Sequence, residues 1–184
     1  MNSPSILRNL EIGSVNYNGG TRNDLIGLKL QNLSIAGNAV INGGAGTIDL
    51  HLNATSSALI GGLLGFRGGV GDDKVTLLGQ SLRIGGVFSM IGSSGAYIAF
   101  IVPVSGVLGY VNFVGTTGSD LMYLGAPDST GTTQITVLGK VASNLGTGTS
   151  EVRMMDTTVL GAVTHSSTAA AGGDLFVVED SFIK

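Results

Sequence analysis

The sequence predicts an all-β fold: a single-stranded parallel β-helix, or β-solenoid, with about seven coils of about 24 residues and three short strands in each coil. Two patterns support this prediction, namely glycines that recur at a constant interval and apolar residues that alternate between them. The composition agrees, because 31 of the 184 residues are glycine, 43% are hydrophobic and only 5% are aromatic. The chain can therefore fold, but around a narrow core of small side chains.

The first strand of each expected coil ends just before a marker glycine. The markers Gly13, Gly37, Gly61, Gly85 and Gly109 follow one another at one constant interval, which is the length of a coil. The position before each marker is apolar, and so is the position two residues after it: Ile12, Ala36, Ile60, Ile84 and Leu108, then Val15, Ala39, Leu63, Val87 and Val111. In a parallel β-helix, residues one period apart lie above one another and fill the same place in the core. The constant columns therefore favour a solenoid over a sandwich or a barrel.

A glycine turn and a third strand complete the expected coil. About six residues after each marker stand the turn residues Gly19-Gly20, Gly43-Gly44, Gly68-Gly69, Gly92-Ser93 and Gly115-Thr116. Apolar residues then alternate, as in Ile26, Leu28 and Leu30, which is the pattern of a half-buried strand. We expect glycine at these corners to permit positive φ and close stacking of turn on turn.

The later coils keep the marker but change the interval. Gly139 and Gly161 carry the same apolar neighbours, but the interval before Gly139 is longer than the others and the interval before Gly161 is slightly shorter. We attribute the longer interval to a turn-rich insertion near residues 126–133. Residues 1–184 are therefore interpreted as one solenoid domain, in which Phe182 and Ile183 reach the apolar column again.

Charge and sequence signals exclude several classes of protein. Nine Lys and Arg against twelve Asp and Glu, without a basic run, argue against nucleic acid as a partner. The chain has no cysteine and no visible signal peptide. The uncharged stretch Gly95–Gly115 is long enough for a membrane span, but it contains Pro103 and Asn112 and keeps the repeat register, so we expect no span.

One segment resembles a known repeat. Gly68 to Thr76 fits the nonapeptide Gly-Gly-x-Gly-x-Asp-x-apolar-x of the haemolysin-type (RTX) family at every defined position. That resemblance implies a secreted bacterial protein with a calcium-binding β-roll. The whole-chain pattern is similar to right-handed β-helices of bacterial adhesins, surface layers and polysaccharide-degrading enzymes, which implies an extracellular or cell-surface location.

Acidic residues near the turns are the candidate metal ligands. Counting in register gives the column Asp24, Ile48, Asp72, Ala96, Asp120, Glu151 and Asp174, beside which Asp72 and Asp73 form a local pair. Calcium takes six to eight oxygen ligands from neighbouring coils. The calcium candidates are thus Asp72, Asp73, Asp120, Glu151 and Asp174, and the alternative is that these acids only solvate and hydrogen-bond the turns.

Catalytic candidates are few. His51 and His165 fall on different coils, and Asp49, Asp72, Asp73, Lys74 and Arg67 form the best charged cluster. The four tyrosines, Tyr17, Tyr97, Tyr110 and Tyr123, are spread over several coils. We therefore predict no catalytic residues and no cofactor, and calcium stays an alternative.

The leading functional hypothesis is a non-enzymatic structural or surface-interaction solenoid: a stalk, an adhesin segment or a self-assembling unit. The repeat runs almost to both termini, so we expect self-association through the solenoid ends or with neighbouring repeat units. The alternatives are a carbohydrate-active β-helix enzyme or a lectin that binds surface glycans, a calcium-stabilised β-roll, and an ice-binding surface.

Overall fold

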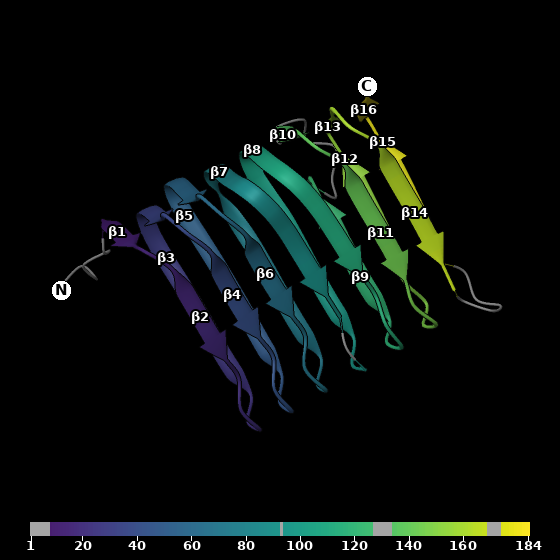
Figure 1. Ribbon diagram of the computed structural model, residues 1–184, viewed down its shortest axis with the longest axis horizontal. Coiled ribbons are helices and arrows are strands. Elements are labelled where there is room, and N and C mark those ends of the chain that lie inside the picture. Colours follow the sequence, from purple (N-terminus) through teal and green to yellow (C-terminus); the bar gives the residue numbers. More distant parts are fainter. Residues whose placement is uncertain (1–7, 93, 127–133, 169–173) are drawn as a thin grey trace, which may run out of the picture.

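The computed structural model confirms the β-solenoid, with about seven turns of parallel stacked coils. It describes residues 8–92, 94–126, 134–168 and 174–184. All regular secondary structure in these ranges is β-strand, and every strand pair is parallel. The first and last coils lie at opposite ends of the stack (Figure 1). Within the described ranges, no helix has the length and apolar character that a membrane crossing requires.

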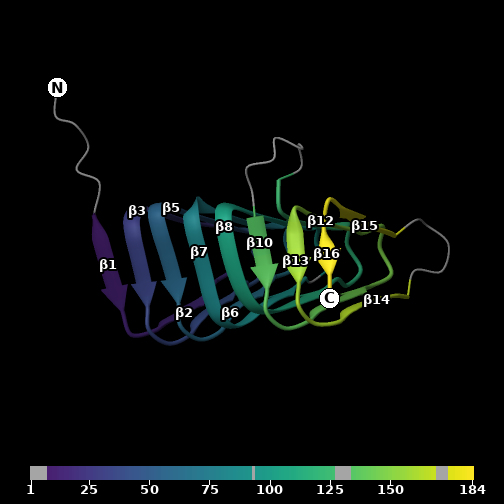
Figure 2. The ribbon, with the colours of Figure 1, turned by 90° about the horizontal axis from the view of Figure 1, so that it is seen from above.

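Each coil has three strand faces, called here A, B and C. Figure 2 looks onto face A, which contains β1 (Asn9–Ile12), β10 (Gln134–Val137), β13 (Thr157–Val159), β16 (Phe182–Ile183) and parts of β3 (Asp24–Ile35), β5 (Ile48–Ile60), β7 (Asp73–Ile91) and β8 (Tyr97–Val114). Face B contains β2 (Val15–Asn18), β4 (Ala39–Asn42), β6 (Leu64–Arg67), the ends of β7 and β8, β11 (Val141–Leu145) and β14 (Val163–Ser167). Face C contains the starts of β3, β5, β7 and β8, followed by β9 (Asp120–Leu124), β12 (Glu151–Met155) and β15 (Leu175–Glu179).

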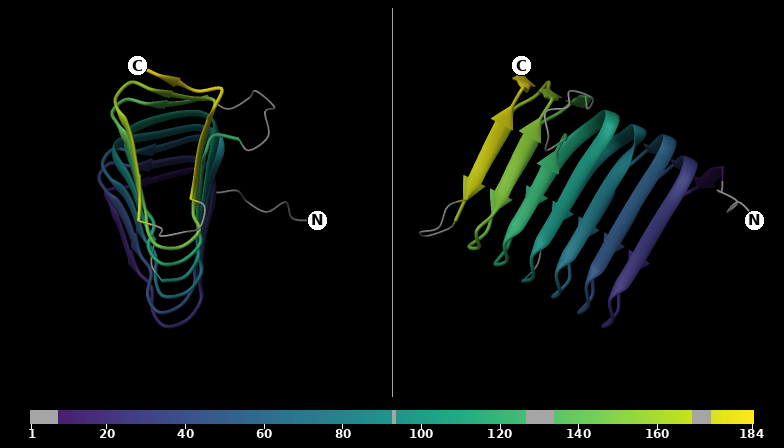
Figure 3. Two further views of the ribbon diagram at one scale, coloured as in Figure 1. Left: turned by 90° about the vertical axis from the view of Figure 1, so that its right-hand side faces the viewer. Right: turned by 180° about the vertical axis from the view of Figure 1, so that it is seen from behind.

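The cross-section shows how the faces meet. Face A is the short side, and faces B and C converge on a narrow glycine-rich tip (Figure 3, left). Seen with the C-terminal end toward the viewer, the advancing chain runs counterclockwise, so the solenoid is right-handed. The three short strands expected per coil are partly merged, since β7 turns through all three faces as one strand.

The strictly constant register is wrong at several positions because the corner between faces A and B and the corner between faces C and A both vary in length. Two residues separate Ile12 from Val15, whereas three separate Ile60 from Leu64. The core columns therefore run through these observed residues: Ile12, Ile35, Ile60, Ile84, Leu108, Val137, Val159 and Ile183 on face A, and Val15, Ala39, Leu64, Phe88, Val111, Val141 and Val163 on face B. Ala36, Leu63 and Val87 are corner residues instead, and so is Leu138, which is 52% exposed.

The lengthened interval falls between faces C and A of one coil. Leu124 pairs with Ile101, and Gln134 pairs with Ser105. Three residues separate Ile101 from Ser105, whereas nine separate Leu124 from Gln134, so six additional residues are accommodated in the later coil. Apart from Ala126, the expected insertion at 126–133 lies outside the described residues.

The core is narrow, as the composition predicts. Side chains alternate between inside and outside on every face, and the buried ones are mostly Val, Ile, Leu and Ala, with Phe66, Phe88 and Phe113 as the larger members. The same alternation continues along β8, whose uncharged sequence winds around the coil.

Glycine is needed at the corners because neighbouring coils approach closely. A Cβ atom on Gly85 would lie 2.5 Å from the carbonyl oxygen of Gly61, and one on Gly46 would lie 2.0 Å from that of Arg22. Neither position has positive φ; among the described glycines only Gly79 and Gly125 do. Of the two expected roles of the corner glycines, close stacking is therefore the general one.

Candidate functional site

The acidic column near the tip differs from the predicted one by one residue in three coils. The strand register places Asp24, Ile48, Asp73, Tyr97, Asp120, Ser150 and Asp174 above one another. The expected members Asp72, Ala96 and Glu151 are therefore wrong, because the spacing between coils varies and a shift of one residue turns a side chain to the other side of the sheet.

Asp73 is held by backbone donors of two coils. Its side chain is 3% exposed. Oδ1 accepts a hydrogen bond from the Ile48 N–H at 2.8 Å, and Oδ2 accepts one from the Gly69 N–H at 2.6 Å. Burial raises the pKa of the Asp73 carboxyl, and these two N–H bonds act in the opposite direction. This carboxylate therefore satisfies backbone donors at the glycine turn.

Asp120 occupies the equivalent position two coils later. It is 1% exposed, and its Oδ2 accepts the Thr116 N–H at 2.9 Å. Burial raises the pKa of Asp120 to about 6. Between the two acids, the Tyr97 ring packs against Phe66 and Phe113, with ring centres 5.3 and 6.2 Å away. Burial, followed by the two carboxylates, raises the Tyr97 pKa well above its usual value.

The calcium candidates do not converge. Asp72 is exposed and its Oδ1 accepts the Ala96 N–H at 2.9 Å, whereas Asp73 points inward. Glu151 lies on the outer surface of face C, where it pairs with Arg153. Ser150 lies between Asp120 and Asp174 in the column, so two coils, or about 10 Å, separate these acids. Across the described ranges, no three acidic or histidine side chains are grouped as metal ligands would be.

The candidate catalytic residues are also dispersed. Lys74 follows Asp49 on the outside of face C, whereas Arg67 lies on face B. His51 lies on the outside of face C, and His165 lies five coils further on, on face B.

His165 forms a pair that the sequence did not reveal. Its Nδ1 lies 2.8 Å from the Ser143 Oγ, and its ring stacks on Phe176 with a centroid distance of 4.7 Å. Ser143 is 4% exposed beneath the last coil, so a substrate cannot reach its hydroxyl.

The outer surfaces of faces B and C differ in chemistry. Face B presents mainly polar residues, among them Asn16, Asn18, Asn42, Ser89, Asn112 and Asn144. Face C presents three outward rows. The tip row is Leu25, Asp49, Lys74, Ile98, Leu121, Glu151 and Leu175, and the middle row is Gly27, His51, Thr76, Phe100, Tyr123, Arg153 and Val177. The third row includes Lys29, Asn53, Leu78, Val102, Met155 and Glu179. The tip and middle rows are apolar in the fourth coil, which contributes Ile98 and Phe100, and in the fifth coil, which contributes Leu121 and Tyr123.

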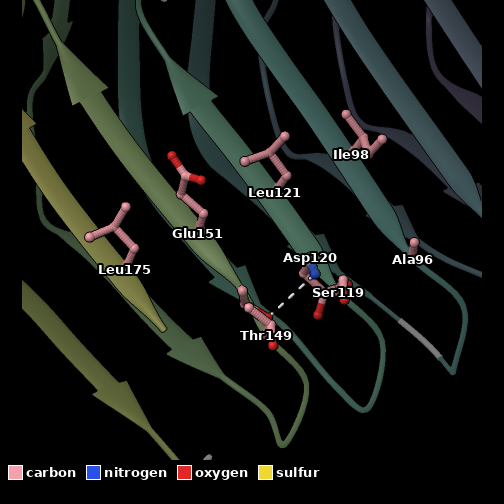
Figure 4. Close-up of a pocket in the computed structure, with 9 residues that line it drawn as sticks. Ala96, Ile98, Ser119, Asp120, Leu121, Thr149, Glu151 and Leu175 are labelled. Carbon is pink, nitrogen blue, oxygen red and sulfur yellow. Dashed lines mark hydrogen bonds between the residues drawn. The ribbon is translucent and has the colours of Figure 1, made fainter. Parts of the chain in front are cut away.

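A shallow groove of about 440 Å³ follows the tip row (Figure 4). Ile98, Leu121, Glu151 and Leu175 line it in consecutive coils. In the middle row beside it, Phe100 and Tyr123 stack with ring centres 5.3 Å apart, and Arg153 lies 5.9 Å from the Tyr123 ring centre. By the register, Phe100 and Arg153 approach Tyr123 from opposite sides, so its ring is flanked by two side chains of the same face.

The two ends of the solenoid also differ. At the N-terminal end, a cavity of about 250 Å³ runs from first-coil residues such as Leu10, Val15 and Ile26 inward as far as Leu77, and its lining residues are apolar except for the Tyr17 hydroxyl. At the C-terminal end, the inward-facing residues of the last strands are partly uncovered: Ile183 on face A is 46% exposed and Val178 on face C is 38% exposed, and Val163 ends the column on face B. The described residues thus leave apolar core columns accessible at both ends.

Comparison with protein-family models, with curated proteins and with solved structures finds no match for this chain.

Proposed function

We propose that this chain is a non-enzymatic structural β-solenoid that extends by end-to-end stacking, with its N-terminal end docking on the C-terminal end of another copy. The observation that carries this proposal is the apolar cavity at the N-terminal end, because core columns that stop at an open end favour a further coil of the same kind.

On face A the core column continues across such a junction, because Ile183 would lie on Ile12 of the next copy. β16 begins a further coil on face A alone. On faces B and C the end strands of the two copies would therefore lie two coil spacings, or about 10 Å, apart in the same columns, Val163 above Val15 and Phe176 above Ile26.

Charge supports the same head-to-tail order. The first coil carries Arg8, Arg22 and Lys29 beside two acids, whereas the last coil carries Asp174, Glu179 and Asp180 beside one lysine. Glu179 and Lys29 occupy the same outward row of face C, so the junction places opposite charges about 10 Å apart in that row. Contacts of this heterologous kind do not close, and they produce a filament.

An extracellular or cell-surface role, as a stalk or an adhesin segment, is part of this proposal and draws on the resembling bacterial solenoids. The alternative of a lectin or a carbohydrate-active enzyme receives less support, because the candidate charged residues are dispersed over two faces and Phe100 stacks on the Tyr123 ring. A calcium-stabilised β-roll stays a separate prediction, tested below.

The test compares two substitutions by sedimentation velocity and electron microscopy. Ile26→Lys places a charge in the open end and is expected to reduce the assemblies to single copies. Val70→Lys changes an apolar residue that is 65% exposed at the third tip, and it is expected to leave assembly unchanged. Equal assembly by both variants, or a parent chain that stays monomeric at high concentration, contradicts the proposal.

A further inference from the structure

We propose that the outer surface of face C is a second interface, which pairs face to face with the same surface of another copy. The two copies are related by a two-fold axis that lies in the interface, parallel to the strands, between the fourth and fifth coils. This lateral contact is independent of end-to-end stacking. The right-hand panel of Figure 3 shows the side of the solenoid that carries it.

The centre of this surface is apolar in two neighbouring coils. Ile98 and Phe100 on β8 stand beside Leu121 and Tyr123 on β9. In the same two coils, the outward residues of face B are Ser89 and Ile91 on β7, beside Asn112 and Val114 on β8. Face B therefore alternates polar and apolar residues along each strand, whereas face C is apolar at all four positions. A continuous apolar patch bordered by charges is typical of a protein interface.

The charges that border the patch are complementary under the proposed symmetry. The axis reverses the order of the coils and keeps each row opposite itself. Lys74 in the third coil then faces Glu151 in the sixth coil of the second copy, and the reverse contact forms at the same time. Asp49 lies diagonally opposite Arg153 of the second copy. At the centre, Phe100 faces Tyr123 and Ile98 faces Leu121. A partner with the same face therefore matches both the apolar and the charged parts of the patch.

The size of the surface suits a dimer. Six coils at about 4.8 Å, with about six residues of roughly 3.3 Å along each strand, give a face of roughly 30 Å by 20 Å. Each copy therefore contributes about 600 Å², close to the ~800 Å² per partner of a standard interface. Twisted sheets of this size pack face to face in β-sandwiches.

Because the chain has no cysteine, single introduced cysteines report this geometry directly. Lys74→Cys and Glu151→Cys chains are prepared separately, mixed and mildly oxidised. We expect a disulfide-linked pair of chains in the mixture at about tenfold or more the yield of either variant alone. The matched control is Arg67→Cys mixed with Asn144→Cys, which lie in the same coils on face B.

This readout separates the lateral contact from end stacking. In an end-to-end filament, Lys74 of one copy lies about five coils, or roughly 24 Å, from Glu151 of the preceding copy, too far for a disulfide. The same crosslink is therefore expected in the Ile26→Lys background, where end stacking is blocked. A yield in the Lys74/Glu151 mixture no higher than that of the control pair overturns the lateral interface and leaves the end-stacking proposal untouched.

Charge reversal gives a second readout in chains without cysteine. Lys74→Glu and Glu151→Lys are each expected to weaken the dimer about tenfold, and the double variant to restore it. Leu121→Asp is expected to abolish the dimer, whereas Ile91→Asp, on face B of the fourth coil, retains it. Additive weakening in the double variant, or equal loss with Leu121→Asp and Ile91→Asp, contradicts the proposed pairing.

Discussion

The buried carboxyl of Asp120 makes the stability of the solenoid depend on pH in an unusual direction. Its pKa is raised from 3.8 to about 6, chiefly by burial. A group whose folded pKa is raised binds its proton more tightly in the folded chain than in the unfolded one. Its contribution to stability is therefore fully present below pH 3.8 and is lost as the pH rises through about 6.

The Asp120→Asn substitution isolates this contribution. A shift of roughly two units corresponds to about 3 kcal/mol, at about 1.36 kcal/mol per unit. Between pH 3.5 and pH 7.5, we expect the free energy of unfolding of Asp120→Asn to rise by about 3 kcal/mol relative to that of the parent chain. Comparing the two chains removes the contributions of all other titrating groups.

The assay is urea unfolding followed by circular dichroism across this pH range. The control is Ser150→Ala, one coil away in the same column, which removes the Oγ that accepts the Asp120 N–H at 3.3 Å. It is expected to lower the free energy of unfolding by about 1 kcal/mol at every pH. Parallel pH profiles for the parent and Asp120→Asn would refute the argument.

Three further predictions concern the turns and the core. Gly44→Ala places a Cβ atom 2.0 Å from the Gly20 carbonyl oxygen, and we expect it to lower the free energy of unfolding in urea by at least about 2 kcal/mol. The control Gly20→Ala has nothing within 4 Å of its Cβ atom and is expected to lower it by less than about 1 kcal/mol. Equal effects of the two substitutions contradict the stacked turns. Tyr97→Phe removes a buried hydroxyl that has no hydrogen-bond partner among the described residues. We expect this substitution to raise the free energy of unfolding by up to about 1 kcal/mol. A loss of stability contradicts this reasoning, because it indicates that the hydroxyl has a partner. Millimolar calcium is expected to leave the melting temperature unchanged, because both Asp73 oxygens already accept N–H bonds; a rise that Asp73→Asn abolishes favours the β-roll alternative.

The sequence predicted the architecture because corner glycines are under direct steric constraint. Gly37, Gly85 and Gly109 stack on the preceding corners, so the constant interval reflects contacts between coils. The same reasoning located the narrow core, since a column must hold side chains of similar size in every coil.

The details that failed depend on single residues. The corner after face A contains two residues in the first coil and three in the next, and glycine spacing alone does not distinguish these cases. A second irregularity lies between faces C and A, where one residue separates Leu30 from Asn32 but two separate Ala54 from Ser57. In a strand, a shift of one residue exchanges inside and outside, and this one moved Asp72 out of the column and Asp73 into it. The outward stack of Phe100 and Tyr123 was missed for the same reason, because their interval is one residue shorter than the assumed period.

The most direct test of the central claim is cryo-electron microscopy of the assembled chain. The account predicts rods of constant cross-section, many copies long, with a repeat of about 4.8 Å along the rod axis that continues across the junctions between copies. Isolated particles of one copy at every concentration, or rods whose strands run along the axis, would contradict it.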